Sequence, residues 1–266
     1  MKTQMLLTLF LSSSLLQAEG QEFWMQPERF LIAAGEKLAV SFKKGENFMD
    51  EPWLITKAQI ENLTMHHSAK SNNLMDSIAD GEKNNLMHLI KATGTYVLTL
   101  QSHNMLAELP ADQFNEYLKS YGLDEILDQR TRSNTLSSPA RDHYAVQSKL
   151  MFQVGDNRDD TYKKEIGFQA EIIPDRNPYA LKVGDQIRFK ILFDGKPVFG
   201  VRAKVWNRFD NRTTIQNIYT EKDGTFEARI SNPGPWMVTV VRMMPSKETR
   251  SDWQSYRSSL IFGIEK

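Results

Sequence analysis

Five side chains in this sequence are of the types that bind soft or borderline metal ions: His66, His67, His103, Met105 and Met243. A neutral imidazole or a thioether can bind nickel, cobalt, copper or zinc, but a protein site needs about three or four ligands that converge in space. Adjacent residues of a strand point to opposite faces, so at most one of His66 and His67 would enter a shared site. The polar residues around this pair favour an exposed loop, and ordinary packing is the expected role of the other three.

Signatures of catalysis are missing from the sequence. It contains no cysteine, no G-x-S-x-G turn, no H-E-x-x-H helix and no glycine-rich phosphate loop. Asp156, Asp159 and Asp160 could offer oxygen ligands to calcium, but Arg158 lies among them and the pattern indicates a solvated turn. We therefore expect no catalytic residues, no firmly bound cofactor and no enzymatic activity.

The amino-terminal segment has the features of a secretory signal peptide. Lys2 precedes an apolar run over residues 5–16, and the small-residue site Ala18-Glu19-Gly20 follows. The run is shorter than the roughly 20 apolar residues that span a bilayer. We expect export to remove residues 1–20 and to leave a periplasmic or secreted protein that does not span the membrane.

The composition is that of an ordinary globular protein. After removal of the signal peptide about 245 residues remain, which is enough for one large domain or two small ones. Hydrophobic residues make up 40% of the sequence, and 33 basic residues balance 33 acidic ones. This neutral total gives no electrostatic reason to expect a nucleic acid as partner. The composition does not indicate an oligomeric state.

The spacing of apolar residues predicts a mainly β protein with a linker in its second half. Apolar residues recur at every second position in residues 38–42, 94–100 and 186–193, which is the period of a half-buried strand. Helical spacing near residues 111–130 predicts a short helical insertion. Two prolines bracket polar residues at 174–178, where we expect a domain boundary.

This linker divides the chain into two predicted β-sandwich domains. The first covers residues 21–175 and carries the helical insertion. The second covers residues 176–266, and its short alternating strands are typical of an immunoglobulin-like or prealbumin-like sandwich. Within it, the sequence Glu221-Lys222-Asp223-Gly224 predicts a hairpin turn.

Short segments in a particular order carry a family resemblance over nearly all of the mature chain. They are Glu22–Pro27 and residues 45–48, 109–118, 122–123, 141–144, 149, 171–174, 177–179, 193–198 and 252–256. Together they resemble the secreted bacterial family named domain of unknown function (DUF) 4198, whose members are sometimes labelled NikM-like nickel-uptake proteins. The resemblance implies an exported protein with a link to transition-metal uptake.

Two positions depart from the pattern of this family. Its members commonly carry one histidine just before the acidic-Phe-Trp segment and another near the end of the second domain, where this sequence has Gln21 and Arg242. A side-chain amide and a guanidinium are poor replacements for imidazole ligands, and Arg242 keeps its positive charge at any ordinary pH. We expect nickel or cobalt to bind weakly, or not at all, through these positions.

The sequence thus favours an exported, non-enzymatic binding or accessory protein, linked to nickel or cobalt uptake by family resemblance. Its expected partner is an envelope or transporter protein. The alternative is a structural or adhesive envelope module that binds glycans or another protein. Trp24, Trp206, Trp236 and Trp253 would form a sugar-stacking platform if they were exposed, although tryptophan in a sandwich is more commonly buried.

Overall fold

The structure is a computed structural model of the chain, and it describes residues 21–49, 51–79 and 85–265. The expected signal peptide lies outside the described residues. The described chain is mainly β, as the alternation of apolar residues predicts, with eighteen strands and two α-helices. No helix among the described residues is long and apolar enough to cross a membrane.

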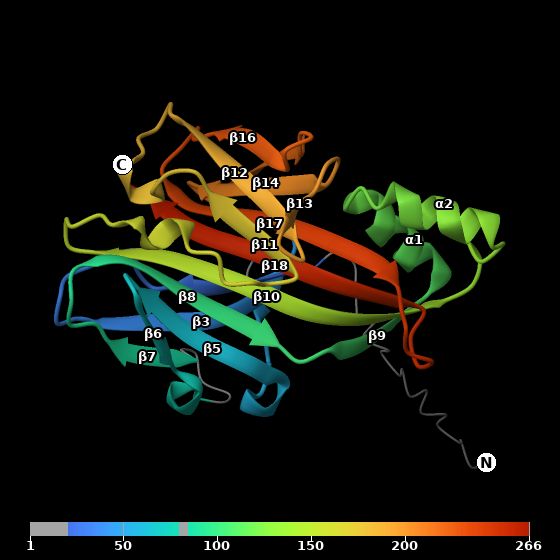
Figure 1. Ribbon diagram of the computed structural model, residues 1–266, viewed down its shortest axis with the longest axis horizontal. Coiled ribbons are helices and arrows are strands. Elements are labelled where there is room, and N and C mark those ends of the chain that lie inside the picture. Colours follow the sequence, from blue (N-terminus) through green and yellow to red (C-terminus); the bar gives the residue numbers. More distant parts are fainter. Residues whose placement is uncertain (1–20, 50, 80–84, 266) are drawn as a thin grey trace, which may run out of the picture.

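A ten-stranded sheet runs through the whole molecule (Figure 1). Eight strands follow one another in the order β15, β14, β17, β18, β10, β8, β5, β6, and two short strands, β2 and β9, also pair with β10. Their bounds are Arg212–Tyr219 (β15), Arg202–Phe209 (β14), Gly234–Pro245 (β17), Trp253–Ile264 (β18), Ala140–Val154 (β10), Gly94–Ser102 (β8), Ile60–His67 (β5), Lys70–Asn73 (β6), Leu31–Ile32 (β2) and Met105–Leu109 (β9).

Two four-stranded sheets pack against this central sheet. The first is formed by β1 (Glu22–Pro27), β3 (Lys37–Gly45), β4 (Glu51–Pro52) and β7 (Leu86–Leu89). The second is formed by β11 (Ala170–Pro174), β12 (Gln186–Phe193), β13 (Lys196–Pro197) and β16 (Thr225–Arg229). Four short 3₁₀ helices complete the described elements, at Lys57–Gln59, Met75–Ser77, Asp160–Lys163 and Pro178–Ala180.

The two halves of the chain are joined by a parallel pair of central strands. β10 from the first half lies beside β18 from the second, in a register that runs from Asp142 opposite Trp253 to Leu150 opposite Ile261. Figure 1 shows these two strands, yellow-green and red, along the length of the molecule. The halves on either side of the expected linker therefore share one sheet.

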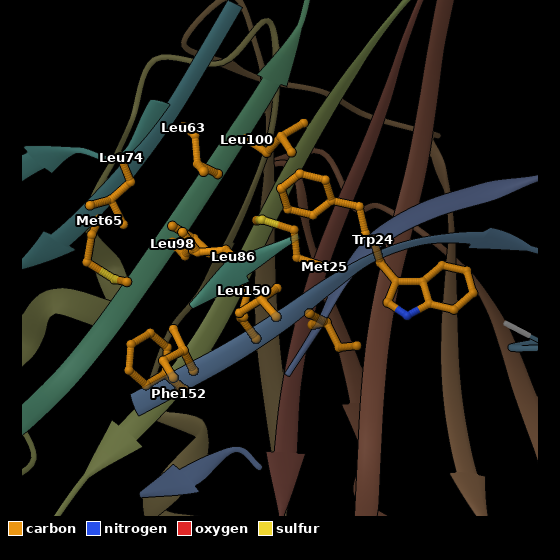
Figure 2. Packing of buried hydrophobic residues seen from close by; sticks show 14 of the residues in the cluster. Trp24, Met25, Leu63, Met65, Leu74, Leu86, Leu98, Leu100, Leu150 and Phe152 are labelled. Atoms are coloured by element: carbon orange, nitrogen blue, oxygen red, sulfur yellow. The ribbon is translucent and has the colours of Figure 1, made fainter. Parts of the chain in front are cut away.

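The apolar cores also cross the expected boundary. Figure 2 shows the largest cluster, in which Met25 of β1 packs with Leu98 of β8 and Leu150 of β10. Met237 and Ile261 from the second half belong to the same cluster. The strand immediately before the linker, β11, pairs with β12 of the second half. The boundary at residue 175 stays a prediction, but the structure puts this last strand of the first predicted domain with the second.

Two helices occupy the stretch in which helical spacing was found. They are α1 (Ala111–Ser120) and α2 (Asp124–Arg132), and they lie together at one end of the molecule (Figure 1). Phe114, Tyr117 and Leu118 form the buried face of α1. This face packs against Val241 and Trp253, so the insertion covers one end of β17 and β18.

Candidate functional site

His66 is a buried residue of β5. Its Nδ1 lies 2.8 Å from the Ser71 hydroxyl and its Nε2 lies 3.1 Å from the Thr99 hydroxyl, so both ring nitrogens have partners. Burial lowers the pKa of His66 to about 4, which keeps the ring neutral at ordinary pH. The prediction of an exposed loop at this position is wrong, because the polar neighbours Ser71 and Thr99 are themselves strand residues that satisfy the imidazole.

The other candidate metal ligands are in environments different from that of His66. His67 stacks on the ring of Tyr96 at 4.2 Å between ring centroids, and its Nε2 is 3.7 Å from Asp159 Oδ2. His103 is exposed after β8, Met105 is half-buried on β9, and Met243 is buried against the helices. No group of three or more His, Cys, Asp or Glu residues in the described part of the chain could hold a metal ion.

The two family-equivalent positions lie on opposite faces of β17. Arg242 places its guanidinium 5.4 Å from the centre of the Phe193 ring, on the face that packs against the second small sheet. Gln21 lines a small cavity with Val241 and Arg257, on the other face. Val241 and Arg242 are neighbours on β17, so their side chains lie on opposite faces of this strand. Gln21 lies on the side of Val241 and therefore does not point toward a common site with Arg242.

Asp159 of the aspartate cluster stabilises a loop. Asp159 accepts hydrogen bonds from the backbone N–H of Thr161 at 2.9 Å and of Thr95 at 3.1 Å, so this carboxylate holds its loop against β8.

The tryptophans are buried. Trp206, Trp236 and the other three tryptophans of the described chain are all at most 8% exposed. They form no row on the surface on which a sugar ring could stack.

A pocket of about 220 Å³ opens where the start of β1, the turn after β3, helix α1 and strand β14 meet. We call it the Glu22 pocket. It is lined by four ionisable carboxylate or ammonium side chains, two aromatic residues and two small polar residues: Glu22, Glu46, Glu116, Lys204, Tyr117, Trp206, Asn47 and Ser120.

Glu22 is a buried carboxyl group, with only 4% of the residue exposed. The Tyr121 hydroxyl donates a hydrogen bond of 2.7 Å to Glu22 Oε1, and Lys204 Nζ lies 3.5 Å from the same oxygen. Burial raises the pKa of Glu22 to about 7 despite the opposing effect of the Lys204 charge. The group therefore changes its charge near neutral pH.

Lys204 is held among aromatic rings as well as beside Glu22. Its Nζ lies 3.6 Å from the centre of the Tyr121 ring and 5.6 Å from that of Trp206. Lys204 and Trp206 are two residues apart on β14, which places them on one face of the strand. Burial lowers the pKa of Lys204, and the carboxylate of Glu22 opposes this effect. Together the carboxyl group and the two rings form a cage around an ammonium group.

A strained turn fixes the rim of the pocket. Asn47 and Phe48 have φ values of +53° and +60°, and the N–H of Met49 donates to the C=O of Glu46 at 2.8 Å. A positive φ is unusual for a residue as large as Phe48. Its ring packs 5.4 Å from Trp24, and Arg208 Nη1 donates to its C=O at 3.1 Å. These contacts hold the two rim residues that precede Phe48 in place.

Carboxyl groups outnumber ammonium groups among the residues that line the pocket. Glu22, Glu46 and Glu116 face one ammonium group among the lining residues, that of Lys204. Glu116 also pairs at 2.7 Å with Lys119, an exposed residue of the same helix. Above the pKa of Glu22, which is about 7, the lining carboxylates outnumber the lining ammonium group, and this favours a cation over an anion.

The sequence does not predict this pocket, because Glu22 and Lys204 lie 182 positions apart and neither has a motif around it. The only available signal was the family resemblance. Three of the segments that carry it, at Glu22–Pro27, 45–48 and 109–118, contribute lining residues to the Glu22 pocket. Segments far apart in the sequence thus meet at one place.

Comparison with known proteins agrees with this resemblance. Residues 18–243 match the family described as a domain of unknown function (DUF4198). No curated protein matches the sequence.

Similarity to solved structures is weak. A tetra-tandem repeat from the extending region of a large adhesion protein shares 7% identity, with a TM-score of 0.24, and the match covers 91% of this chain and 49% of that one. Three amino-terminal domains of the bacteriophage RB49 outer capsid protein Hoc share 11% identity over 91% of this chain and 59% of that one, with a TM-score of 0.20. Dimeric latent PorU from Porphyromonas gingivalis shares 11% identity over 96% and 21%, also with a TM-score of 0.20. The chain thus spans less than two thirds of each of these structures.

Proposed function

We propose that this chain, which belongs to the DUF4198 family, is an exported binding protein without enzymatic activity whose ligand occupies the Glu22 pocket. The observation that carries the proposal is the convergence of three family-like segments on one pocket that contains a buried, ionisable carboxyl group. Strained backbone at the rim, where Phe48 has a positive φ, adds support, because such strain concentrates at binding sites.

The proposed ligand is a small organic cation that carries a primary ammonium group. The ammonium of Lys204, a lining residue, already lies beside the Glu22 carboxyl group and two aromatic rings, that of Trp206 in the pocket lining and that of Tyr121 outside it. The same chemistry would recognise the ammonium of a free ligand, and the carboxylates of Glu46 and Glu116 would attract it. A volume of about 220 Å³ suits a ligand of a few heavy atoms rather than a polymer.

Nickel or cobalt uptake, which the family resemblance implies, stays a separate hypothesis in this proposal. Imidazole ligands are absent from the residues that line the Glu22 pocket. A metal would have to bind through His66, His67, His103, Met105 or Met243, which have different surroundings in the fold. We further propose that the protein is periplasmic or secreted and that its partner is an envelope or transporter protein. The proposed arrangement of its strands is two immunoglobulin-like or prealbumin-like sandwiches.

Calorimetric titration of the mature protein tests the proposed function. We expect a primary diamine such as putrescine to bind, and inorganic sulfate and nickel not to bind in the pocket. Glu46→Gln should weaken amine binding on the order of tenfold, since it removes a carboxylate from the lining of the pocket. Glu51→Gln, at an exposed residue outside the pocket, is the matched control and should leave affinity unchanged.

A second variant changes affinity in the opposite direction. Lys204→Met removes the ammonium that occupies the cage and leaves Glu22 without its cation. We expect this variant to bind the amine more tightly than the wild type. Amine binding that is absent from the wild type and from this variant, or that is indifferent to both Glu46→Gln and Lys204→Met, would refute the proposal.

A further inference from the structure

Strand β15 forms one edge of the central sheet, and it differs from the strand at the other edge. The opposite edge strand, β6, has four residues, begins with Lys70 and has Lys164 beside Ser71 at 3.2 Å. Short length and lysine are common means of preventing unwanted strand pairing. β15 has eight residues, contains no proline and carries a single charge, on Arg212.

Hydrogen-bond parity shows which backbone groups of β15 point outward. Asp210 and Asn211 both have positive φ, so the β14–β15 hairpin has a two-residue type I′ turn, and its flanking pair, Phe209 and Arg212, is hydrogen-bonded. At the other end of the strand, the N–H of Thr220 donates to Val201 and its C=O accepts from Gly200, both at 3.0 Å. Even-numbered residues thus bond toward β14.

It follows that four alternate residues of β15 direct both backbone groups away from the sheet. These are Thr213, Ile215, Asn217 and Tyr219. Within the described chain no strand pairs with this edge. β16, which follows β15, pairs with β12 of another sheet and reaches β15 through the Gln216 side chain, whose Nε2 donates to the C=O of Arg229 at 3.2 Å.

We propose that β15 pairs with β15 of a second copy of this chain, antiparallel, with the two-fold axis at Gln216. In this register Thr213 lies opposite Tyr219 of the second copy, and Ile215 lies opposite Asn217. Each such pair exchanges two hydrogen bonds. All four outward residues of both copies are then used, and two ten-stranded sheets become one.

The identity of the partner follows from the symmetry of this edge. The outward residues are distributed evenly about Gln216, so the strand is complementary to itself, which a two-fold interface requires. Arg212 falls opposite Thr220 of the second copy, and no like charges meet across the axis. The chain has a formal net charge of zero, so two copies do not repel each other as wholes.

Sedimentation equilibrium of the mature protein measures the association. We expect a monomer–dimer equilibrium. Asn217→Pro removes an outward N–H and leaves the bonds to β14 intact, so it should weaken the dimer on the order of tenfold or more without unfolding the chain. Asn217→Ala is the matched control and should retain the dimer. Circular dichroism and a melting curve check that the proline variant is folded.

A cysteine cross-link tests the register itself, because the natural sequence has no cysteine. In the proposed pairing the two copies of residue 216 face each other at a non-hydrogen-bonded position, where Cα atoms are about 4.5 Å apart and a disulfide can form. Gln216→Cys should therefore cross-link under oxidised glutathione. Arg212→Cys, on the same strand but about eight residues from its copy, should not.

Two results would overturn this proposal. One is a monomeric mass at every soluble concentration, which would mean that β15 can pair only with a strand of a different protein. The other is a dimer that still forms in Asn217→Pro, or a cross-link that forms as readily in Arg212→Cys as in Gln216→Cys.

Discussion

Lys149 Nζ on β10 lies 2.5 Å from Glu171 Oε1 on β11, and both side chains are at most 3% exposed. The ammonium also donates to the C=O of Ile172 at 3.2 Å. The carboxylate accepts from the backbone N–H groups of Ile166 at 2.6 Å and Gly167 at 2.9 Å. This buried pair therefore connects the central sheet to the second small sheet and to the loop that precedes it.

Removing one partner of this pair should be costly. Lys149→Met leaves the Glu171 carboxylate buried without its cation, and we expect the free energy of unfolding to fall by about 3–5 kcal/mol. The double variant Lys149→Met/Glu171→Gln should recover most of this loss. Urea unfolding measures both changes. Lys163→Met, which breaks an exposed ion pair with Asp160, is the control and should change stability little. A double variant as unstable as the single one would show that packing, not charge, dominates.

The pKa of Glu22 predicts a dependence of stability on pH. Its value of about 7 in the folded chain lies above the ordinary value of 4.5. The folded state therefore holds the proton more tightly, and the associated stability is complete below pH 4.5 and lost as pH rises through 7. Since Gln does not titrate, the stability of the wild type relative to Glu22→Gln should fall by on the order of 3 kcal/mol over this window. Unfolding at a series of pH values measures the difference, which a flat profile would contradict.

His66 should act in the opposite direction. Its pKa of about 4 in the folded chain lies below the ordinary value of 6.5, because the imidazole is buried. The unfolded chain thus binds the proton more readily, and stability is lost as pH falls from 6.5 toward 4. His66→Gln should lack this loss while keeping partners for Ser71 and Thr99. The ring-proton chemical shift in an NMR titration measures the pKa directly, and a midpoint near 6.5 would show that the ring is not shielded.

The double variant Gln21→His/Arg242→His should not create a nickel or cobalt site. The two side chains lie on opposite faces of β17, so two imidazoles placed there could not share one ion. Calorimetric titration of the variant beside the wild type measures this. Affinity that rises in the double variant but in neither single variant would contradict this prediction, because it would mean that the two imidazoles bind one ion together.

The predicted boundary at residues 174–178 can be tested with two fragments. Residues 176–266 lack β11, which pairs with β12 and adds Ile172 to the core of the second half. We expect residues 168–266, which retain β11, to unfold at a higher urea concentration. Equal midpoints would show that β11 is dispensable. Aggregation of both fragments would show that the second half needs β10 to fold.

Local features of the fold could be predicted from the sequence, because their signals are local. The alternation in β12 and the apolar spacing in α1 depend on residues a few positions apart. The turn at Glu221–Gly224 was correctly located but wrongly predicted to be a hairpin, since β15 and β16 on its two sides belong to different sheets. The residue types of Glu221–Gly224 suit both a hairpin turn and a turn that connects strands of two different sheets.

The pairing of β10 with β18 and the Glu22 pocket could not be predicted in this way. Asp142 and Trp253 are opposite each other in the sheet but more than a hundred positions apart, and a parallel pair leaves no turn sequence between its strands. Glu22 and Lys204 are farther apart still. Their contact follows from the packing of β1, which belongs to a different sheet, on the central sheet that contains β14.

The central place of β18 also determines when the chain can fold. β18 is the last strand of the described chain, yet it lies between β10 and β17 in the middle of the sheet. Synthesis from the amino terminus therefore produces β10 with one long edge unpaired until residues 253–264 have been made. Contacts between such distant residues also make folding slow. The central sheet is therefore completed only when β18 has been made and lies between β10 and β17.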